Sequence, residues 1–481
     1  MTSKSQPDHR QTVYYPEVSE VSRRGDQWVY WAPQQRVAVK LGPVAAGIME
    51  VCRDTTSRAE IISLALSRFK LPFASVPTVE RLLDNLTAIG FLNETRFEPE
   101  ARQAAPAASF KPLILYLHLT VKCNLSCSYC YNVEHRMLER RARPLSRVEL
   151  LDLIQLAARR GVRTVNFTGG EPLLSRDWEI LARRCKELNI ATTLLTNGAL
   201  ITERNAKTIA ELFTVTILSL DSPDHHIHDA QRGRGSHAKA LRGIHALRDA
   251  GYRQLVLRPV LTRHNLDTLA EFPDFAAREC GNIAFIPVTY VPNSVEEEQA
   301  LQLSPALPEL QRATTAFRVA LQRVGGKITD TMEIPDDDML ASNRCGAGAG
   351  IISVDFNGDL YPCQAIHDPR TKMGNLRDGD WFEIAGGAAP GAAFRSIDHS
   401  DIEVCKSCSF NEICGGGCRA TAIKLYGSIT SHNRALCDIN KANAWNQIWA
   451  RLEQARPGSA VDPADETSGS CSSDVCASGC V

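Results

Sequence analysis

The chain has 481 residues, 44% of them hydrophobic, so it can bury several cores, and its length suggests about three domains. Its 54 lysines and arginines balance 55 aspartates and glutamates, which excludes a general attraction to nucleic acid or anionic lipid. The first residues are polar and no run of about 18 apolar residues appears, so we expect no secretion signal, no membrane span and a cytoplasmic location. In a reducing compartment, 16 cysteines indicate metal or redox chemistry and not a disulfide framework.

Residues 12–95 are predicted to form a small separate domain. Two extended segments, 27–31 and 36–41, precede helices near 44–52 and 58–69. A third helix carries one apolar stripe, made of Val79, Leu82, Leu83, Leu86, Ile89 and Leu92. Strands followed by three short helices predict a winged-helix-like domain.

Two functions are possible for this first domain, DNA binding and peptide binding. Residues 1–95 hold 11 Lys or Arg against 10 Asp or Glu, too even a balance for a face that binds phosphates. Residues 47–92 resemble the small peptide chaperone of pyrroloquinoline quinone biosynthesis, a recognition element for ribosomally made, modified peptides. That resemblance implies that a leader peptide adds as an extra strand to the exposed sheet edge and packs against the third helix.

After a Pro- and Ala-containing linker at 96–111, strands and helices alternate over residues 112–325. Strands are expected at 113–120, 163–168, 190–196, 215–220, 255–260 and 283–288, and helices at 147–160, 176–187, 203–212, 237–250 and 266–278. Six such units predict an α/β fold, a parallel sheet curled as a partial (β/α)6 TIM-like barrel. Functional loops should follow the carboxyl ends of its strands.

Cys123, Cys127 and Cys130 lie just past the first of these strands, in a CxxxCxxC spacing. Three thiolates can hold three irons of a 4Fe-4S cluster and leave the fourth iron open to a small molecule. A structural zinc site is the alternative, but zinc normally takes four protein ligands in a closed site. The spacing therefore favours a cluster with one open iron.

The motif resembles the signature of the radical S-adenosylmethionine (radical SAM) superfamily, over about residues 112–300. The resemblance implies that S-adenosylmethionine binds the open iron and is cleaved by one electron to a 5′-deoxyadenosyl radical, which removes a hydrogen atom from the substrate. It also implies a reductant such as flavodoxin or ferredoxin. Tyr129 matches an aromatic residue near the adenine, although ordinary packing explains it equally well.

Further contacts to S-adenosylmethionine follow from the same resemblance. The TGGEP motif after the second strand matches the methionine-binding motif, with glycines that admit a close backbone approach and a glutamate for the ammonium group: Gly169, Gly170 and Glu171. Asn197 and Ser219 end the next two strands. Each is expected either to contact S-adenosylmethionine or to cap a helix or turn. His225, His226 and His228 are expected to be solvated loop residues without a metal.

A second group of thiols lies in residues 340–453, and it comprises Cys345, Cys363, Cys405, Cys408, Cys414, Cys418 and Cys437. Asn357-Gly358 predicts a two-residue hairpin turn that brings Cys345 and Cys363 together. The seven-cysteine pattern resembles the SPASM extension of radical enzymes, which implies two auxiliary 4Fe-4S clusters. By that resemblance one cluster takes Cys405, Cys408, Cys414 and Cys437, and the other takes Cys345, Cys363 and Cys418 and is a ligand short. A zinc ribbon explains the CxxC pairs but not all seven thiols.

The remaining cysteines fall into two groups. Cys52, Cys185 and Cys280 are predicted to be buried and inert. The tail 454–481 is predicted to be disordered, and its Cys471, Cys476 and Cys480 either are solvated or serve as a ligand or relay.

Together these features predict a radical maturase that crosslinks a ribosomally made precursor peptide, with a thioether favoured over a carbon–carbon bond. No catalytic side chain is assigned. Peptide epimerisation and formylglycine formation are the enzymatic alternatives; for the latter, Gln364 stands where sulfatase-maturing enzymes carry an acidic base. An iron–sulfur winged-helix redox sensor that binds DNA is the non-enzymatic one.

Overall fold

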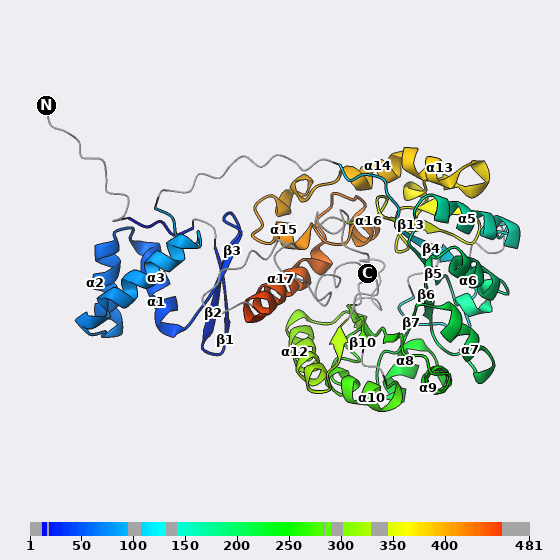
Figure 1. Cartoon of the computed structure of the whole chain (residues 1–481), viewed down its shortest axis with the longest axis horizontal. Helices are drawn as coiled ribbons and strands as arrows, with labels where there is room; N and C mark the ends of the chain where they lie inside the picture. Colours follow the sequence, from blue (N-terminus) through cyan, green and yellow to red (C-terminus); the bar gives the residue numbers. More distant parts are fainter. Residues whose placement is uncertain are drawn as a thin grey trace. The chain divides into compact units, whose positions relative to one another are not determined.

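The computed structural model describes residues 12–16, 19–94, 107–130, 142–281, 284–289, 302–328 and 345–454 (Figure 1). The chain divides into two compact units, the first comprising Met1–Ala104, Val404–Cys414 and Asn440–Cys471, and the second Ala105–Glu403, Gly415–Ile439 and Ser472–Val481. Most of the predicted linker and the three tail cysteines lie outside the described residues. Across the described ranges, every helix is too short or too polar to cross a membrane.

The first unit begins with a three-stranded antiparallel sheet in the order β1-β2-β3, followed by three helices. Its elements are β1 (Glu20–Arg24), β2 (Gln27–Ala32), β3 (Val37–Leu41), α1 (Pro43–Asp54), α2 (Arg58–Phe69) and α3 (Val76–Ala88). The two predicted strands and three predicted helices are confirmed, except that α3 ends at Ala88, so Ile89 and Leu92 of the predicted stripe lie beyond it. The prediction missed β1, because its sequence EVSRR is polar and half-exposed and lacks the apolar alternation of a typical strand.

Both faces of this sheet are buried. Alternate residues of a strand point to opposite faces, and Tyr30 packs with the helices whereas Val29 and Trp31 pack with Phe410 and Trp449. The Trp31 indole Nε1 donates a 2.7 Å hydrogen bond to the Ser409 carbonyl oxygen. Residues 404–414 and the end of α17 (Arg434–Gln454) therefore belong to the first unit, which the sequence did not predict.

The second unit contains a ten-stranded sheet in the order β12-β10-β8-β7-β6-β5-β4-β13-β14-β15. Eight strands form the parallel part: β4 (Ile114–His118), β5 (Thr164–Thr168), β6 (Ala191–Thr196), β7 (Val215–Leu218), β8 (Leu255–Leu257), β10 (Ala284–Phe285), β12 (Lys327–Ile328) and β13 (Ile351–Val354). The helices of this part are α5 (Arg147–Arg159), α6 (Trp178–Glu187), α7 (Glu203–Leu212), α8 (His225–Arg232), α9 (Ser236–Asp249), α10 (Phe272–Glu279) and α12 (Leu307–Arg323). The predicted strand 255–260 is split, since β9 (Val260–Leu261) pairs with β11 (Val288–Thr289) in a separate sheet.

Helices α5, α6 and α7 follow one side of strands β4 to β7 in Figure 1. Leu115 and Leu117 of β4 belong to the large apolar core on that side, with the buried residues of these helices. Ile114 and Tyr116 point to the opposite face, where they pack with Ile351. We call this opposite face, defined by these three residues, the inner face of the sheet.

The C-terminal part of the second unit extends the same sheet. Its elements are β13 (Ile351–Val354), which runs parallel to β4, β14 (Asp359–Tyr361), β15 (Gly374–Asn375), α13 (Trp381–Gly387), α14 (Ala389–Ser396) and α16 (Arg419–Tyr426); α15 (Asn411–Cys414) belongs to the first unit. Strands β13 and β14 form the predicted hairpin, but its loop has three residues, 356–358, because the Asp355 amide pairs with the Asp359 carbonyl. Gly358 at the end of the loop has φ +90°, which glycine adopts without a steric penalty.

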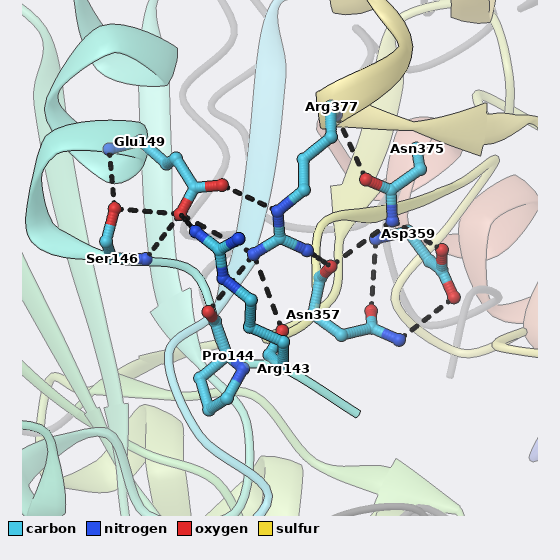
Figure 2. Close-up of polar contacts among 8 residues, drawn as sticks. All are labelled: Arg143, Pro144, Ser146, Glu149, Asn357, Asp359, Asn375 and Arg377. Carbon is cyan, nitrogen blue, oxygen red and sulfur yellow. Dashed lines mark hydrogen bonds and ion pairs between the residues drawn. The ribbon is translucent and has the colours of Figure 1, made fainter. Parts of the chain in front are cut away.

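Arg377, which follows β15, links this hairpin to the start of α5 (Figure 2). Its Nε donates to Glu149 Oε1 at 2.6 Å, and its Nη1 donates to the Asn357 carbonyl at 2.8 Å. Glu149 also accepts from the backbone amide of Ser146, which caps the helix in return. One arginine thus ties the helix cap to the hairpin loop.

This contact predicts a pH-dependent contribution to stability. The hydrogen bond from the Ser146 amide, followed by that from Arg377, lowers the pKa of Glu149 to about 2. Because the folded-state pKa is depressed, the contribution is complete above the unfolded value near 4.5 and is lost as the pH falls toward 2. Glu149→Gln should lower stability by about 1 kcal/mol at pH 7, and the difference in melting temperature from the wild type should vanish near pH 2.

The matched control is Glu179→Gln, which removes an exposed carboxylate that pairs with Arg183 along α6. It should change stability less, because exposed pairs contribute little. A Glu149→Gln difference that stays constant from pH 7 to pH 2 would contradict the prediction.

Candidate active site

The structure gathers the three predicted cluster ligands in the loop after β4. Burial raises the pKa of Cys127 to about 11. Cys123 and Cys130 lie close enough to Cys127 to raise this pKa further. The loop is held against the end of α8, because the Ser128 amide donates to the Gln231 carbonyl at 2.9 Å. Three thiols at one place fit a thiolate-bound iron–sulfur cluster.

The two glycines of the TGGEP motif pack against the segment that leads into the cysteine loop. The Gly170 amide donates to the Thr120 carbonyl at 2.7 Å, and the Glu171 amide to the Lys122 carbonyl at 2.8 Å. A Cβ atom at Gly170 would lie 2.1 Å from the Lys122 carbonyl oxygen, and one at Gly169, whose φ is +128°, would lie 2.3 Å from that of Thr120. The glycines were expected to admit a ligand; in the structure they admit the backbone of the cysteine loop.

Gly170→Ala should therefore displace the TGGEP loop from the cysteine loop. We expect 5′-deoxyadenosine formation to fall by on the order of 10²-fold, since a shift of about 1 Å at a reacting site has that effect. Gly387→Ala is the control, because a Cβ there meets nothing within 4 Å. A folded Gly170→Ala protein with activity within about twofold of the wild type would show that the close approach is dispensable.

Glu171 and Asn197 connect the ends of neighbouring strands to the cysteine loop. The buried Glu171 carboxylate accepts hydrogen bonds from Thr196 Oγ1 at 2.8 Å and from the Asn197 amide at 2.9 Å. Burial raises the pKa of Glu171 to about 7. The Asn197 Nδ2 donates to Asn124 Oδ1 at 2.8 Å, within the cysteine loop, and its Oδ1 caps the turn at Ala199. The turn-capping alternative is thus observed for Asn197, and its proposed contact to S-adenosylmethionine stays a prediction.

Tyr129 contacts a buried ion pair that the sequence did not predict. Arg232 donates from Nε and Nη2 to the two oxygens of Asp221, at 2.7 and 2.9 Å, and both side chains are buried. The Tyr129 hydroxyl donates to the same carboxylate, and the Arg232 guanidinium lies 5.4 Å from the centre of its ring. Burial acts to raise the pKa of Asp221, but the charge and hydrogen bonds of Arg232 outweigh it and hold this pKa below its ordinary value.

The three histidines lie on α8 and not in a loop, and only two of them are solvated. His228 is 1% exposed, and its Nδ1 accepts a hydrogen bond from the Asp221 amide at 3.2 Å. Burial lowers the pKa of His228 to about 4, so the ring is neutral. The expectation of a solvated His228 is wrong, because the sequence predicts a loop here, whereas the segment forms α8 and buries His228. Ser219 follows β7, and its amide donates to the Thr196 carbonyl at 2.9 Å.

Cys345, Cys363 and Cys418 share one apolar cluster in the second unit, with Cys363 and Cys418 buried. Burial, and after it the neighbouring Cys345, raises the pKa of both of these thiols. The hairpin has therefore brought Cys345 and Cys363 together as predicted. The grouping of Cys437 with three cysteines of the first unit, Cys405, Cys408 and Cys414, stays a prediction.

The three cysteines that were predicted to be inert are buried. Cys52, Cys185 and Cys280 are 2%, 0% and 3% exposed, and burial raises the pKa of each to about 12. They are neutral thiols in apolar surroundings, which confirms the prediction of burial.

Two features define an iron–sulfur enzyme. The parallel sheet carries three thiols at the carboxyl end of its first strand, and a second segment is rich in cysteines. Residues 117–276 match the Radical SAM superfamily, and residues 345–409 match SPASM, an iron-sulfur cluster-binding domain. The chain belongs to the radical SAM superfamily.

Curated relatives include mycofactocin maturases and PqqA peptide cyclases. The mycofactocin maturase MftC of Mycolicibacterium smegmatis is 31% identical over 316 residues, which cover 64% of this chain and 78% of that protein. The PqqA peptide cyclase of Rhodopseudomonas palustris is 28% identical over 337 residues, 67% of this chain and 86% of that protein.

Solved structures share the fold. SuiB of Streptococcus suis bound to S-adenosylmethionine superposes with a TM-score of 0.57 at 19% identity, and the match covers 88% of this chain and 99% of SuiB. Native anSMEcpe with bound AdoMet gives a TM-score of 0.58 at 20% identity, over 72% of this chain and 100% of that one. The predicted fold class, a radical SAM partial barrel with a SPASM domain, is confirmed.

The chain is thus a radical SAM enzyme whose cofactors are S-adenosylmethionine, a 4Fe-4S cluster and auxiliary iron–sulfur clusters. The residues present fit these groups, because the three-thiol loop and the buried three-thiol cluster offer soft thiolate ligands. Cys123, Cys127 and Cys130 would hold the first cluster. The contacts to S-adenosylmethionine expected from Gly169, Gly170, Glu171, Asn197, Ser219 and Tyr129 stay predictions.

Proposed function

We propose that this enzyme is a cytoplasmic peptide maturase that crosslinks a ribosomally made precursor, with flavodoxin or ferredoxin as its reductant. The curated relatives are named a maturase and a peptide cyclase. Structures with the same fold hold peptides: SuiB is bound to its precursor peptide SuiA, and anSMEcpe is bound to the Kp18Cys peptide. These names support a peptide as the substrate class.

The observation that carries the proposed reaction is the shared apolar cluster of Cys345, Cys363 and Cys418, in which Cys363 and Cys418 are buried and Cys345 is half-buried. When bound, the cofactors supply a 5′-deoxyadenosyl radical and a local electron acceptor. A three-thiol site leaves a position for a fourth thiolate, and a cysteine of the precursor has the required chemistry. We therefore favour a thioether: one C–H and one S–H bond are lost and one C–S bond is formed, so that the product is two hydrogens lighter.

We assign recognition of the leader to the winged-helix-like domain at residues 12–95. In the described ranges β3 pairs with β2 alone, so its second edge has backbone groups that an added strand can use. Strand addition is tolerant of sequence, and side chains of α3 would supply selectivity. The leader would then hold the precursor while its core residues react.

The test is an anaerobic incubation of the reconstituted enzyme with S-adenosylmethionine, a reductant and the peptide encoded beside its gene. We expect the peptide to lose two hydrogens and one alkylatable thiol, with tandem mass spectra that place the bond on a cysteine. Loss of two hydrogens with all thiols still alkylatable would indicate a carbon–carbon bond. An unchanged mass with one deuterium gained from D₂O would indicate epimerisation and would overturn the proposal.

Hydrogen–deuterium exchange of the full chain tests the recognition step separately. Addition of the leader alone should slow exchange in β3 and leave α6, in the other unit, unchanged. The same leader in excess should inhibit modification of the full precursor. Protection confined to the second unit would argue against the assignment of residues 12–95.

A further inference from the structure

Three side chains converge on the inner face of the sheet, outside the sites assigned above. His118 is the last residue of β4, Asp355 follows β13, and His367 lies in the segment after β14. One ligand atom from each lies within 4.8 Å of the other two. His118 is 3% exposed, and the side chains of Asp355 and His367 are 2% and 1% exposed.

The pairing of two strands places the first two residues. Strands β4 and β13 are parallel, with Leu117 opposite Val354, so that the next residues, His118 and Asp355, continue the two strands side by side. Both residues follow the alternation of Ile114, Tyr116 and Ile351, and they therefore lie on the inner face. This is the same end of β4 from which the cysteine loop leaves.

Two contacts orient the third residue. The His367 ring stacks on Tyr361 of β14, with ring centres 4.4 Å apart, and its Nε2 hydrogen-bonds Ser353 Oγ at 2.9 Å. This arrangement directs Nδ1 toward Asp355, where it lies 3.7 Å from Oδ2. That separation is longer than a hydrogen bond, and it is close to the ~3.4 Å between two tetrahedral ligands that each lie ~2.1 Å from a zinc ion.

We propose that His118, Asp355 and His367 bind a divalent metal ion, namely zinc. Two imidazoles and one carboxylate are ligands that zinc prefers, and a metal-bound histidine commonly has its other ring nitrogen held by a hydrogen bond, as Ser353 holds His367. The three ligand atoms lie within 4.8 Å of one another, so the side chains need to move inward by no more than roughly 1 Å on binding. Three protein ligands leave a fourth position on the inner face for water or a substrate atom.

The test uses the holoenzyme, reconstituted anaerobically with its full iron content and then given one equivalent of ZnCl₂. After gel filtration, elemental analysis should find one zinc per chain. The zinc X-ray absorption spectrum should show nitrogen and oxygen neighbours at about 2.0–2.1 Å and no sulfur at about 2.3 Å. This spectrum distinguishes zinc bound at the proposed site from zinc bound by cysteines. The measurement is made on the wild-type protein alone.

Variants give a second test of the same site. Asp355→Asn and His367→Gln should abolish zinc retention, and Ser353→Ala should weaken the affinity by about 10- to 100-fold, the usual effect of a residue that orients a ligand. His226→Gln, on the exposed start of α8, is the control and should retain zinc. Sulfur neighbours in the wild-type spectrum, no zinc bound, or equal zinc in the Asp355→Asn protein at unchanged iron content would each overturn the proposal. Because none of these results depends on a peptide, failure here is distinguishable from failure of the proposed maturase reaction.

Discussion

Replacement of Cys123, Cys127 and Cys130 by alanine should reduce the formation of 5′-deoxyadenosine to background. The three thiols are gathered in one loop after β4, and they are the ligands through which a cluster with an open iron would be held. Without them no open iron is available for S-adenosylmethionine, so that its cleavage stops together with any change in the peptide. Iron content and 5′-deoxyadenosine are measured on anaerobically reconstituted protein.

Two other substitutions separate this effect from a general loss of thiols. Cys185→Ala removes a buried thiol of α6 and should retain activity. Cys363→Ala, in the second thiol cluster, should retain cleavage of S-adenosylmethionine but prevent the loss of two hydrogens from the peptide. If the triple variant still made 5′-deoxyadenosine at the wild-type rate, the three-thiol loop would not be the active site.

Asp221→Leu should destabilise the second unit by roughly 3–5 kcal/mol, the usual effect of removing one partner of a buried ion pair. The substitution leaves the buried Arg232 guanidinium without its carboxylate, and it also removes the acceptor of the Tyr129 hydroxyl and of the Val260 amide. Arg232 directly follows Gln231, whose carbonyl holds the cysteine loop, so cluster content should fall as well. Thermal unfolding and iron analysis measure the two effects.

The double variant Asp221→Leu/Arg232→Met is the informative control. Because it removes both charges, it should recover much of the lost stability. Glu179→Gln in the exposed pair with Arg183 should change stability by about 1 kcal/mol or less. A double variant that is less stable than Asp221→Leu would show that the destabilisation does not arise from an uncompensated charge.

The sequence predicted those features whose signals are local. The strands of the barrel, the cysteine loop and the TGGEP motif each lie in a short stretch with its own spacing, and the structure brings the latter two together. It did not predict the Asp221–Arg232 pair, because the partners are eleven positions apart in the sequence and the helix that brings them together was not recognised. The sequence also predicted a two-residue hairpin loop, whereas the loop has three residues. The local Asn-Gly preference does not include the pairing of Asp355 with Asp359, which sets the loop length.

The packing of the first unit limits how this enzyme can be divided into parts. Phe410 of the segment Val404–Cys414 and Trp449 of α17 bury their side chains on the same sheet face as Val29 and Trp31. A truncation that removes the N-terminal 95 residues would leave these aromatic side chains solvated, next to three of the SPASM cysteines. Grafting the N-terminal domain onto another maturase would consequently require transfer of residues 404–414 and 440–454 with it.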